Sequence, residues 1–342
     1  MILLLLIPCL IAILIAAGIL FQRMGAYLDR RRHTSHGRWV RTHGGRELYV
    51  FEKGEGRPVV LFESGIAATH LNWRRIQESV ASFARTASYD RMGLGGSSPS
   101  RTARTARNIV SELHAMLREA GIEPPYILVG HSFGGLVMRR FALSYPDEVA
   151  GVVLVDPMRL EEWPPINESK QATLDRGKRM TRYAILIARL GMAGLAVTSL
   201  LCRSGKLCRW LASLAGESGR LVIQRISDEV AKMPEEIRPA VAAHWSRPSF
   251  YLGMHSYLES IPGSVREMET AKPIRTIPIK VLTPGRAIEL SDQALRQIGD
   301  NVQQVIAPAS AHWIYLDEPH LLIDAIREMV FAANVGNTAV IV

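Results

Sequence analysis

The strongest chemical signal in the sequence is a serine held between glycines, in the run Gly130–Gly134 (GHSFG). This run directly follows an apolar stretch, Tyr126–Val129, and directly precedes a stretch with helical periodicity, Leu136–Ser144. Between a strand and a helix, a G-x-S-x-G spacing forces a sharp turn that needs small flanking residues and leaves the serine projecting. We therefore predict that Ser132 is a nucleophile. A glycine-rich turn with an incidental serine is the alternative.

A second candidate group is a histidine far along the chain, His312, which follows the apolar stretch Asn301–Ile306. A serine hydroxyl is a poor nucleophile until a base takes its proton, and an imidazole titrates close enough to neutral pH to do so. The position after the last predicted strand favours His312 as this base over His131 and His320. His131 is too close to Ser132 along the chain, and His320 already belongs to the final predicted helix. A surface or core role is the alternative for His312.

Short apolar strands alternate with helices around these two residues, which is typical of a parallel sheet covered on both faces. From about Pro157 to Lys272 no convincing strand is found, so this segment is predicted to be a helical insertion over the open edge of the sheet. Strands are predicted at Glu47–Glu52, Pro58–Glu63, Thr86–Tyr89, Tyr126–Val129, Val149–Val155, Ile277–Leu282 and Asn301–Ile306, and helices at Leu71–Phe83, Asn108–Ala120, Leu136–Ser144 and Leu321–Ala332.

Several segments are similar to motifs of the α/β-hydrolase superfamily, and the similarity covers nearly everything from Trp39 to Ala332. They resemble its nucleophile elbow, its YDR-x-G-x-G-x-S turn, its oxyanion loop and its histidine loop with the start of the last helix. The resemblance implies an α/β-hydrolase fold: a mostly parallel central sheet, helices on both faces, and a helical cap inserted between the sixth and seventh strands. The segments are Gly130–Pro157 (GHSFGGLVMRRFALSYPDEVAGVVLVDP), Tyr89–Ser97 (YDRMGLGGS), Glu63–Ile66 (ESGI), Ser310–Trp313 (SAHW) and Leu316–Pro319 (LDEP).

The resemblance also implies an oxyanion hole, made of two backbone N–H donors that stabilise the charge on a tetrahedral intermediate. One donor is expected to be Phe133, the residue after the nucleophile. The other is expected to be Ile66, with Gly65 permitting close approach. Asp90 and Arg91, in the segment Tyr89–Ser97, are expected to brace the sheet rather than to take part in chemistry.

The acid that would orient the histidine has more than one candidate in this sequence. Many relatives place an aspartate in a G-x-x-D turn after the penultimate strand, but this chain has no aspartate in that turn. The other position in the fold where this acid can lie is one strand earlier, at the end of Val149–Val155. In this chain Asp156 occupies that position. We predict that Asp156 is the acid of the triad, and Glu289 and Asp292 are the other candidates. The alternative role for Asp156 is to cap the next turn.

The chain opens with an apolar leader, Ile2–Phe21, that contains no charged residue. About 20 helical residues are enough to cross a bilayer, and basic residues crowd the C-terminal side of this run, which favours a cytoplasmic position for that side. We predict a single-pass N-terminal membrane anchor with the catalytic domain in the cytoplasm. The stretch Ala16–Gly18 leaves a cleaved signal peptide, and thus a secreted or periplasmic protein, as the alternative.

Composition excludes several classes of partner. An apolar fraction of 48% and a charged fraction of 21% are typical of a globular protein. The net charge of +9 is concentrated beside the leader rather than along a groove, so no nucleic-acid partner is expected. Cys9, Cys202 and Cys208 form neither a disulfide framework nor a metal site; Cys202 and Cys208 are predicted to be packing residues, with a disulfide as the alternative. No metal or cofactor is expected, because the triad supplies the reacting groups itself.

The predicted organisation is an anchor over residues 1–22, a basic linker over 23–38, a core over 39–156 and 273–335, a cap over 157–272 and a tail over 336–342. In the cap, Tyr183–Leu201 carries one charge, Arg189, between basic clusters. We favour a buried helix lining the substrate pocket. A face that dips into the bilayer surface and admits a lipid-like substrate is the alternative. Either arrangement predicts an apolar pocket.

Together these features predict a serine hydrolase that cleaves carboxylic esters of a hydrophobic or lipid-like small molecule through an acyl-enzyme. The serine argues against dehalogenases and epoxide hydrolases of the same superfamily, whose nucleophile at the elbow is an aspartate. An acyltransferase or an amidase could use the same Ser132 and His312. A non-catalytic, membrane-tethered binding protein is the third alternative, because the G-x-x-D turn lacks its aspartate.

Overall fold

The computed structural model describes residues 9, 13, 16–20, 23–25, 37–42, 44–194, 197, 230–285 and 290–338. Contacts between residues divide the chain into two units. The first unit comprises Met1–His36 with Arg176–His255, and the second comprises Gly37–Asp175 with Ser256–Val342.

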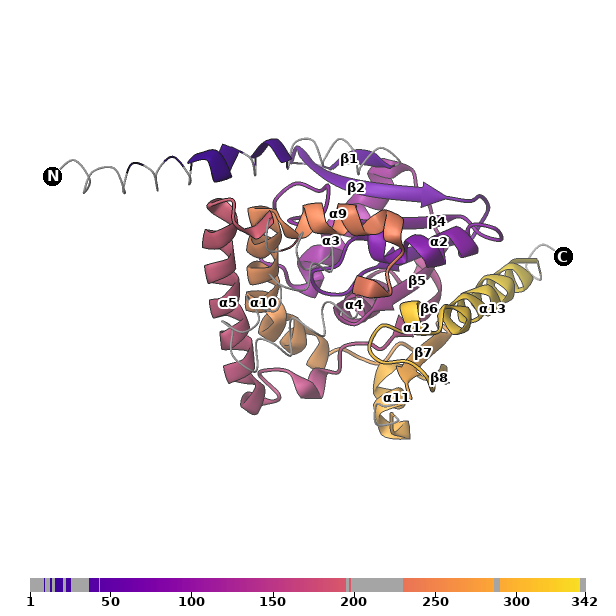
Figure 1. Cartoon of the computed structure of the whole chain (residues 1–342). Coiled ribbons are helices and arrows are strands. Elements are labelled where there is room, and N and C mark those ends of the chain that lie inside the picture. The colour runs from indigo at the N-terminus through magenta and orange to yellow at the C-terminus, as the bar shows by residue number, and fades with distance from the viewer. Residues whose placement is uncertain are drawn as a thin grey trace. The chain divides into compact units, whose positions relative to one another are not determined.

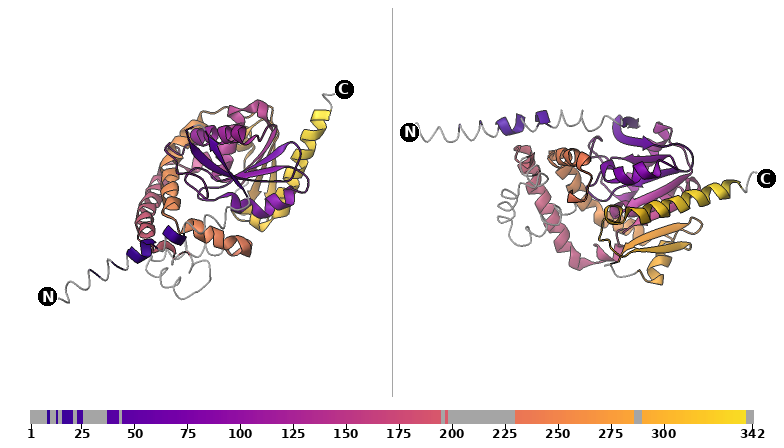
Figure 2. Two further views of the ribbon diagram at one scale, coloured as in Figure 1. Left: turned by 90° about the horizontal axis from the view of Figure 1, so that it is seen from above. Right: turned by 45° about the vertical axis from the view of Figure 1, so that its right-hand side comes forward.

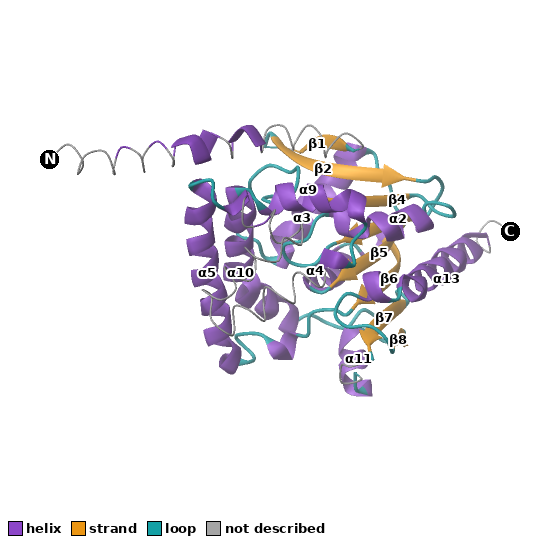
Figure 3. Cartoon of the chain, in the orientation of Figure 1, coloured by secondary structure: helices purple, strands orange, loops and turns teal. Residues whose placement is uncertain are grey.

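The second unit is built on an eight-stranded sheet with the order β1-β2-β4-β3-β5-β6-β7-β8 (Figures 1 and 3). The β1–β2 and β2–β4 pairs are antiparallel, and all the other neighbours are parallel. The inner strands are continuous apolar runs because both of their faces are covered. The strands are β1 (Arg38–Thr42), β2 (Arg46–Lys53), β3 (Val59–Glu63), β4 (Thr86–Tyr89), β5 (Tyr126–His131), β6 (Val149–Val155), β7 (Ile279–Pro284) and β8 (Val302–Ala307).

Helices cover both faces of this sheet. Helices α3 (Ala106–Ala120) and α4 (Phe133–Ser144) pack on one face, and α2 (Arg74–Val80) and α13 (Pro319–Thr338) pack on the other, as Figure 2 shows. Helix α3 is amphipathic, and its apolar side faces the sheet. Two further short helices of this unit are α11 (Asp292–Ile298) and α12 (Ile314–Asp317).

The predicted α/β architecture is confirmed, including the helical insertion between the sixth and seventh strands. The described part of this insertion contains α5 (Gln171–Arg189), α9 (Arg238–Trp245) and α10 (Pro248–Glu269), and no strand. The boundaries of the predicted cap, residues 157 and 272, stay a prediction.

The interpretation of Tyr183–Leu201 as one buried helix is wrong in the part that the structure describes. Helix α5 begins earlier and ends at Arg189. Its side chains Tyr183 and Leu186 are 69% and 57% exposed. The reason is that the apolar residues of this stretch are distributed around the helix instead of being confined to one face. Cys202 and Cys208 lie outside the described residues.

The predicted single-pass anchor over residues 1–22, with a cytoplasmic catalytic domain, is corrected by the structure. A span needs about 20 consecutive apolar residues in one helix. Among the described residues, no helix combines sufficient length with sufficient apolar character to traverse a bilayer. Much of the run Ile2–Phe21 and of the basic linker after it lies outside the described residues.

Candidate active site

Ser132 lies at the turn between β5 and α4, in a left-handed backbone conformation with φ +54° and ψ −121°. A side chain on the preceding Gly130 would clash, because its Cβ would lie 2.5 Å from the carbonyl oxygen of Gly134. Non-glycine residues rarely adopt such a backbone, and they do so mostly at functional sites. The turn between these glycines therefore holds the serine side chain in a cavity at the carboxyl ends of the strands.

His312 is paired with Asp156. The His312 Nδ1 atom lies 2.6 Å from Asp156 Oδ2. Asp156 follows β6 in a left-handed conformation with φ +40°, which aspartate tolerates better than most residues, and its N–H donates to the Leu282 carbonyl at 2.8 Å. The contact between His312 and Asp156 thus joins the segments that follow β8 and β6, which are far apart in the chain.

The two other candidate acids are not part of this pairing. Asp292 begins helix α11 and lines a separate, open cavity on the surface together with Arg296 and Gln297. Glu289 lies outside the described residues. Of the described candidates, Asp156 is thus the one in contact with the imidazole.

The loop that carries His312 is held by two carboxylates from the following segment. The Ala311 N–H donates to Asp317 Oδ2 at 3.1 Å, and the Ser310 hydroxyl donates to Glu318 Oε2 at 2.7 Å. These contacts give Asp317 and Glu318 a role that the sequence analysis did not assign. The signal was present in the sequence, because both residues stand in the LDEP motif.

His131, which directly precedes Ser132, contacts the loop that carries His312. It is buried, and its Nε2 lies 2.9 Å from the His312 carbonyl oxygen. Because a carbonyl can only accept, Nε2 carries the proton and the ring donates. Burial, together with the adjacent His312 ring, lowers the pKa of His131 to about 3. His131 is therefore neutral at physiological pH. Its ring centroid lies 4.6 Å from that of His312.

One cavity of about 480 Å³ collects all five residues predicted for the site. Within the described residues, no hydrogen bond joins the Ser132 hydroxyl to the His312 ring, and such bonds are often long before substrate binds. Phe133 is the first residue of α4, so its N–H has no partner within the helix. The cavity is lined by Ile66, Ser132, Phe133, Asp156, Pro157, Met158, Arg159, Glu162, Trp163, Ile261 and His312.

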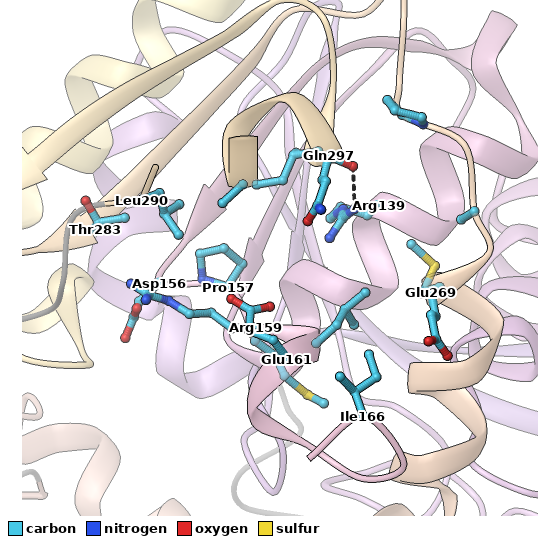
Figure 4. A pocket seen from close by; sticks show the side chains of 17 residues that line it. Arg139, Asp156, Pro157, Arg159, Glu161, Ile166, Glu269, Thr283, Leu290 and Gln297 are labelled. Atoms are coloured by element: carbon cyan, nitrogen blue, oxygen red, sulfur yellow. Dashed lines mark hydrogen bonds between the residues drawn. The ribbon is translucent and has the colours of Figure 1, made fainter. Parts of the chain in front are cut away.

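A second cavity, of about 390 Å³, shares the segment Asp156–Arg159 with the first (Figure 4). Its walls come from α4, α10, α11 and the end of β7. On one side the Arg139 guanidinium donates to the Gln297 carbonyl oxygen at 3.3 Å, as the dashed line in Figure 4 marks. Asp156 thus stands on a wall common to both cavities.

A buried charged network lies behind the expected oxyanion loop. Arg91 donates to the Ser64 carbonyl oxygen at 3.1 Å and to the Gly65 carbonyl oxygen. It also lies 3.3 Å from Glu63 Oε1, and the Tyr89 hydroxyl donates to Glu63 Oε2. Burial raises the pKa of Glu63, and the Arg91 guanidinium opposes that rise. Arg91 therefore bonds to the loop itself, which goes beyond the predicted role of bracing the sheet.

Comparisons with known proteins agree with this architecture. A family described as alpha/beta hydrolase fold matches residues 58–193. The uncharacterized protein YqjL of Bacillus subtilis (strain 168) is 33% identical over 105 residues, 31% of this chain and 42% of that protein. Lipase LipV of Mycobacterium tuberculosis (strain ATCC 25618 / H37Rv) is 36% identical over 112 residues, 32% of this chain and 42% of that protein. The matched region spans less than half the length of either relative.

A solved structure extends the similarity to most of the chain. The structure of epoxide hydrolase CorEH without ligand matches with a TM-score of 0.65 and 18% identity, and the match covers 86% of this chain and 98% of that one. At such low identity the match establishes a shared fold, while the chemistry depends on the site residues.

Proposed function

We propose that this chain, whose residues 58–193 match the alpha/beta hydrolase fold family, is a serine hydrolase of that superfamily that cleaves carboxylic esters of a hydrophobic small molecule. The observation that carries the proposal is the 2.6 Å contact between His312 Nδ1 and Asp156 Oδ2 in a cavity that Ser132 also lines. A carboxylate on one ring nitrogen leaves the other nitrogen free to act as a base.

The proposed reaction proceeds in two halves. Asp156 accepts the Nδ1–H of His312, so Nε2 has a free lone pair and takes the proton from Ser132 Oγ as that oxygen attacks the ester carbonyl. The protonated imidazole then gives its proton to the leaving alcohol, and an acyl-enzyme remains. Water repeats the sequence: His312 takes its proton, the carboxylic acid leaves, and Ser132 regains its hydrogen.

The character of the cavity supports a hydrophobic ester. Large apolar side chains, among them Met158, Trp163 and Ile261, line the same cavity as the serine. These residues belong to a small apolar cluster that also includes Leu174 and Val265. Apolar walls with a few convergent polar groups are typical of sites for small hydrophobic ligands. The partial match to a protein named as a lipase points in the same direction.

Epoxide opening is the weaker candidate despite the structural match to an epoxide hydrolase. Epoxide hydrolases of this superfamily attack with an aspartate at the elbow, and this chain has Ser132 there. We therefore propose acyl chemistry.

The proposal is tested by labelling the purified protein with a fluorophosphonate probe, and by measuring hydrolysis of p-nitrophenyl butyrate. Ser132→Ala should abolish labelling and reduce kcat by about 10⁴-fold or more, because the acyl-enzyme can no longer form. Ser144→Ala, at the far end of the same helix, is the matched control and should behave as the wild type. Labelling of Ser132→Ala at full strength would refute the proposal.

Product analysis distinguishes the alternatives that use the same serine. With an added alcohol or amine, an acyltransferase would give the new ester or amide, whereas a hydrolase gives mainly butyrate. An amidase would also cleave the matching anilide. A wild-type protein that turns over no ester, thioester or amide would favour a binding function instead.

A further inference from the structure

The buried side chain of Arg91 bonds to the expected oxyanion loop, and the proposed reaction does not use it. It comes from the turn after β4 and is 2% exposed. Its guanidinium donates to two consecutive carbonyl oxygens of that loop, those of Ser64 and Gly65. A planar guanidinium with several donors in fixed directions suits such a pair of acceptors.

The bond to the Gly65 carbonyl determines where the next N–H points. The Gly65 carbonyl and the Ile66 N–H belong to one planar, trans peptide unit, so they point in opposite directions. With the oxygen held on the Arg91 side, the N–H is directed away from Arg91. Ile66 lines the catalytic cavity. The Gly65 oxygen also accepts the Ala68 N–H at 3.2 Å, which fixes the same plane a second time.

The loop is also closely packed against the elbow. A Cβ on Gly65 would lie 2.9 Å from His131 Nδ1 and 3.5 Å from Ser132 Cβ. The Arg91 guanidinium carbon lies 5.4 Å from the centre of the Phe133 ring, the residue expected to supply the other donor. Arg91 thus contacts the segments of both expected donors and is not among the residues that line the catalytic cavity.

We propose that Arg91 is a positioning residue for the oxyanion hole: it holds the Gly65–Ile66 peptide so that the Ile66 N–H faces the reacting carbonyl. This inference rests on the proposed serine-hydrolase function. Glu63 is the counter-ion that keeps the guanidinium in place, at 3.3 Å from Nη1, and Tyr89 holds the other carboxylate oxygen. The peptide is therefore oriented before substrate arrives, which is what an oxyanion hole requires.

The first test is Arg91→Lys, because it keeps the charge opposite Glu63 but replaces the planar fork with a single ammonium group. We expect kcat for p-nitrophenyl butyrate to fall at least about tenfold with KM within about twofold, since the lost interaction acts on the transition state. Affinity for a trifluoromethyl ketone, which forms an oxyanion on the serine, should fall by the same factor. Inhibition by butyrate should not change.

The chain offers a matched control in Arg104→Lys. Arg104 is as buried as Arg91, and its guanidinium carbon lies 5.4 Å from the centre of the Tyr257 ring, against 4.8 Å for that of Arg91. It pairs with Glu112 at 2.8 Å instead of with the loop. A purely structural role for a buried arginine would affect both variants alike, whereas the positioning role predicts loss of kcat in Arg91→Lys alone.

A second variant covers the case in which Arg91→Lys does not fold. The pair Glu63→Gln with Arg91→Met removes both charges and leaves an acceptor for Tyr89, so no buried charge is unpaired. We expect the same loss of kcat and of ketone affinity. A folded variant of either kind with kcat within twofold of the wild type overturns the inference. Were the wild type itself inactive and unlabelled, the proposed function would fail instead, so the two failures are distinct.

Discussion

Two imidazoles lie next to each other at the site, and their surroundings give them different properties. His131 is buried and donates from Nε2 to a backbone carbonyl, so its ring is committed to the structure. His312 has a side chain that is 34% exposed, faces a carboxylate and lines the cavity. The comparison shows that residue type alone does not distinguish the two rings: the partner of the bonded ring nitrogen and the exposure of the side chain do, and both support His312 as the proposed base.

The partners also account for how each ring is oriented. The carbonyl that His131 binds is that of His312 itself, so the structural imidazole supports the backbone of the one that would react. A carboxylate can stabilise a protonated ring, and a neutral carbonyl does so far less. The proposed base His312 has a carboxylate partner of this kind, whereas His131 has a carbonyl partner and remains neutral.

The largest effect expected from this comparison comes from removing the carboxylate. Asp156→Asn should lower kcat by about 10³–10⁴-fold, because an amide that donates to Nδ1 stabilises the wrong tautomer and cannot support a protonated ring. The reaction is followed with p-nitrophenyl butyrate under saturation. Asp292→Asn is the control and should retain wild-type kcat, since Asp292 lines a different cavity. Retention of more than a tenth of the activity by Asp156→Asn would move the acid to another residue, with Glu289→Gln as the next variant to measure.

A smaller effect should follow from changing the structural imidazole. His131→Phe removes the donor to the His312 carbonyl and should lower kcat by about 2–13-fold, the kinetic equivalent of one hydrogen bond of about 0.5–1.5 kcal/mol. His131→Gln keeps a donor and should lose less. Steady-state kinetics of the two variants would decide the point. Equal activity of both variants with the wild type would show that the bond does not position the loop.

The sheet could be predicted from the sequence, because buried parallel strands are continuous apolar runs. The boundaries of β4 and β6 coincide with the predicted strands. The edge strand β1 was missed, since only two of its five residues are buried. Helices α11 and α12, of seven and four residues, are too short to show a periodicity. The exposure of Tyr183 and Leu186 on α5 was not predicted, because the burial of a side chain also depends on neighbouring segments that the sequence of one helix does not specify.

The residues of the candidate site that belong to recognisable sequence motifs could be predicted from the sequence. Ser132 and His312 stand in such motifs, and the contact of His312 with Asp156 is the geometry that the prediction of Asp156 requires. The bond from Arg91 to the Gly65 oxygen could not be predicted, because every residue has a carbonyl and the sequence does not say which one an arginine reaches. The catalytic assignments themselves stay predictions until the variants are measured.

The last expected effect concerns stability, and its pH dependence tests whether His131 is neutral in the folded protein. The pKa of His131 falls from 6.5 to about 3 on folding, so between these values the unfolded chain binds a proton that the folded chain does not. Stability should therefore decrease as pH falls below about 6.5, by up to about 1.4 kcal/mol per pH unit, and this one group should cost about 2 kcal/mol between pH 7 and pH 5. His131→Gln cannot titrate, so its free energy of unfolding, measured with urea at both pH values, should fall by about 2 kcal/mol less than that of the wild type. The comparison uses the change with pH within each protein, so a general loss of stability in the variant does not affect it. An equal decrease in both proteins would mean that His131 binds a proton in the folded state as readily as in the unfolded chain, and would contradict the neutral state assigned to it.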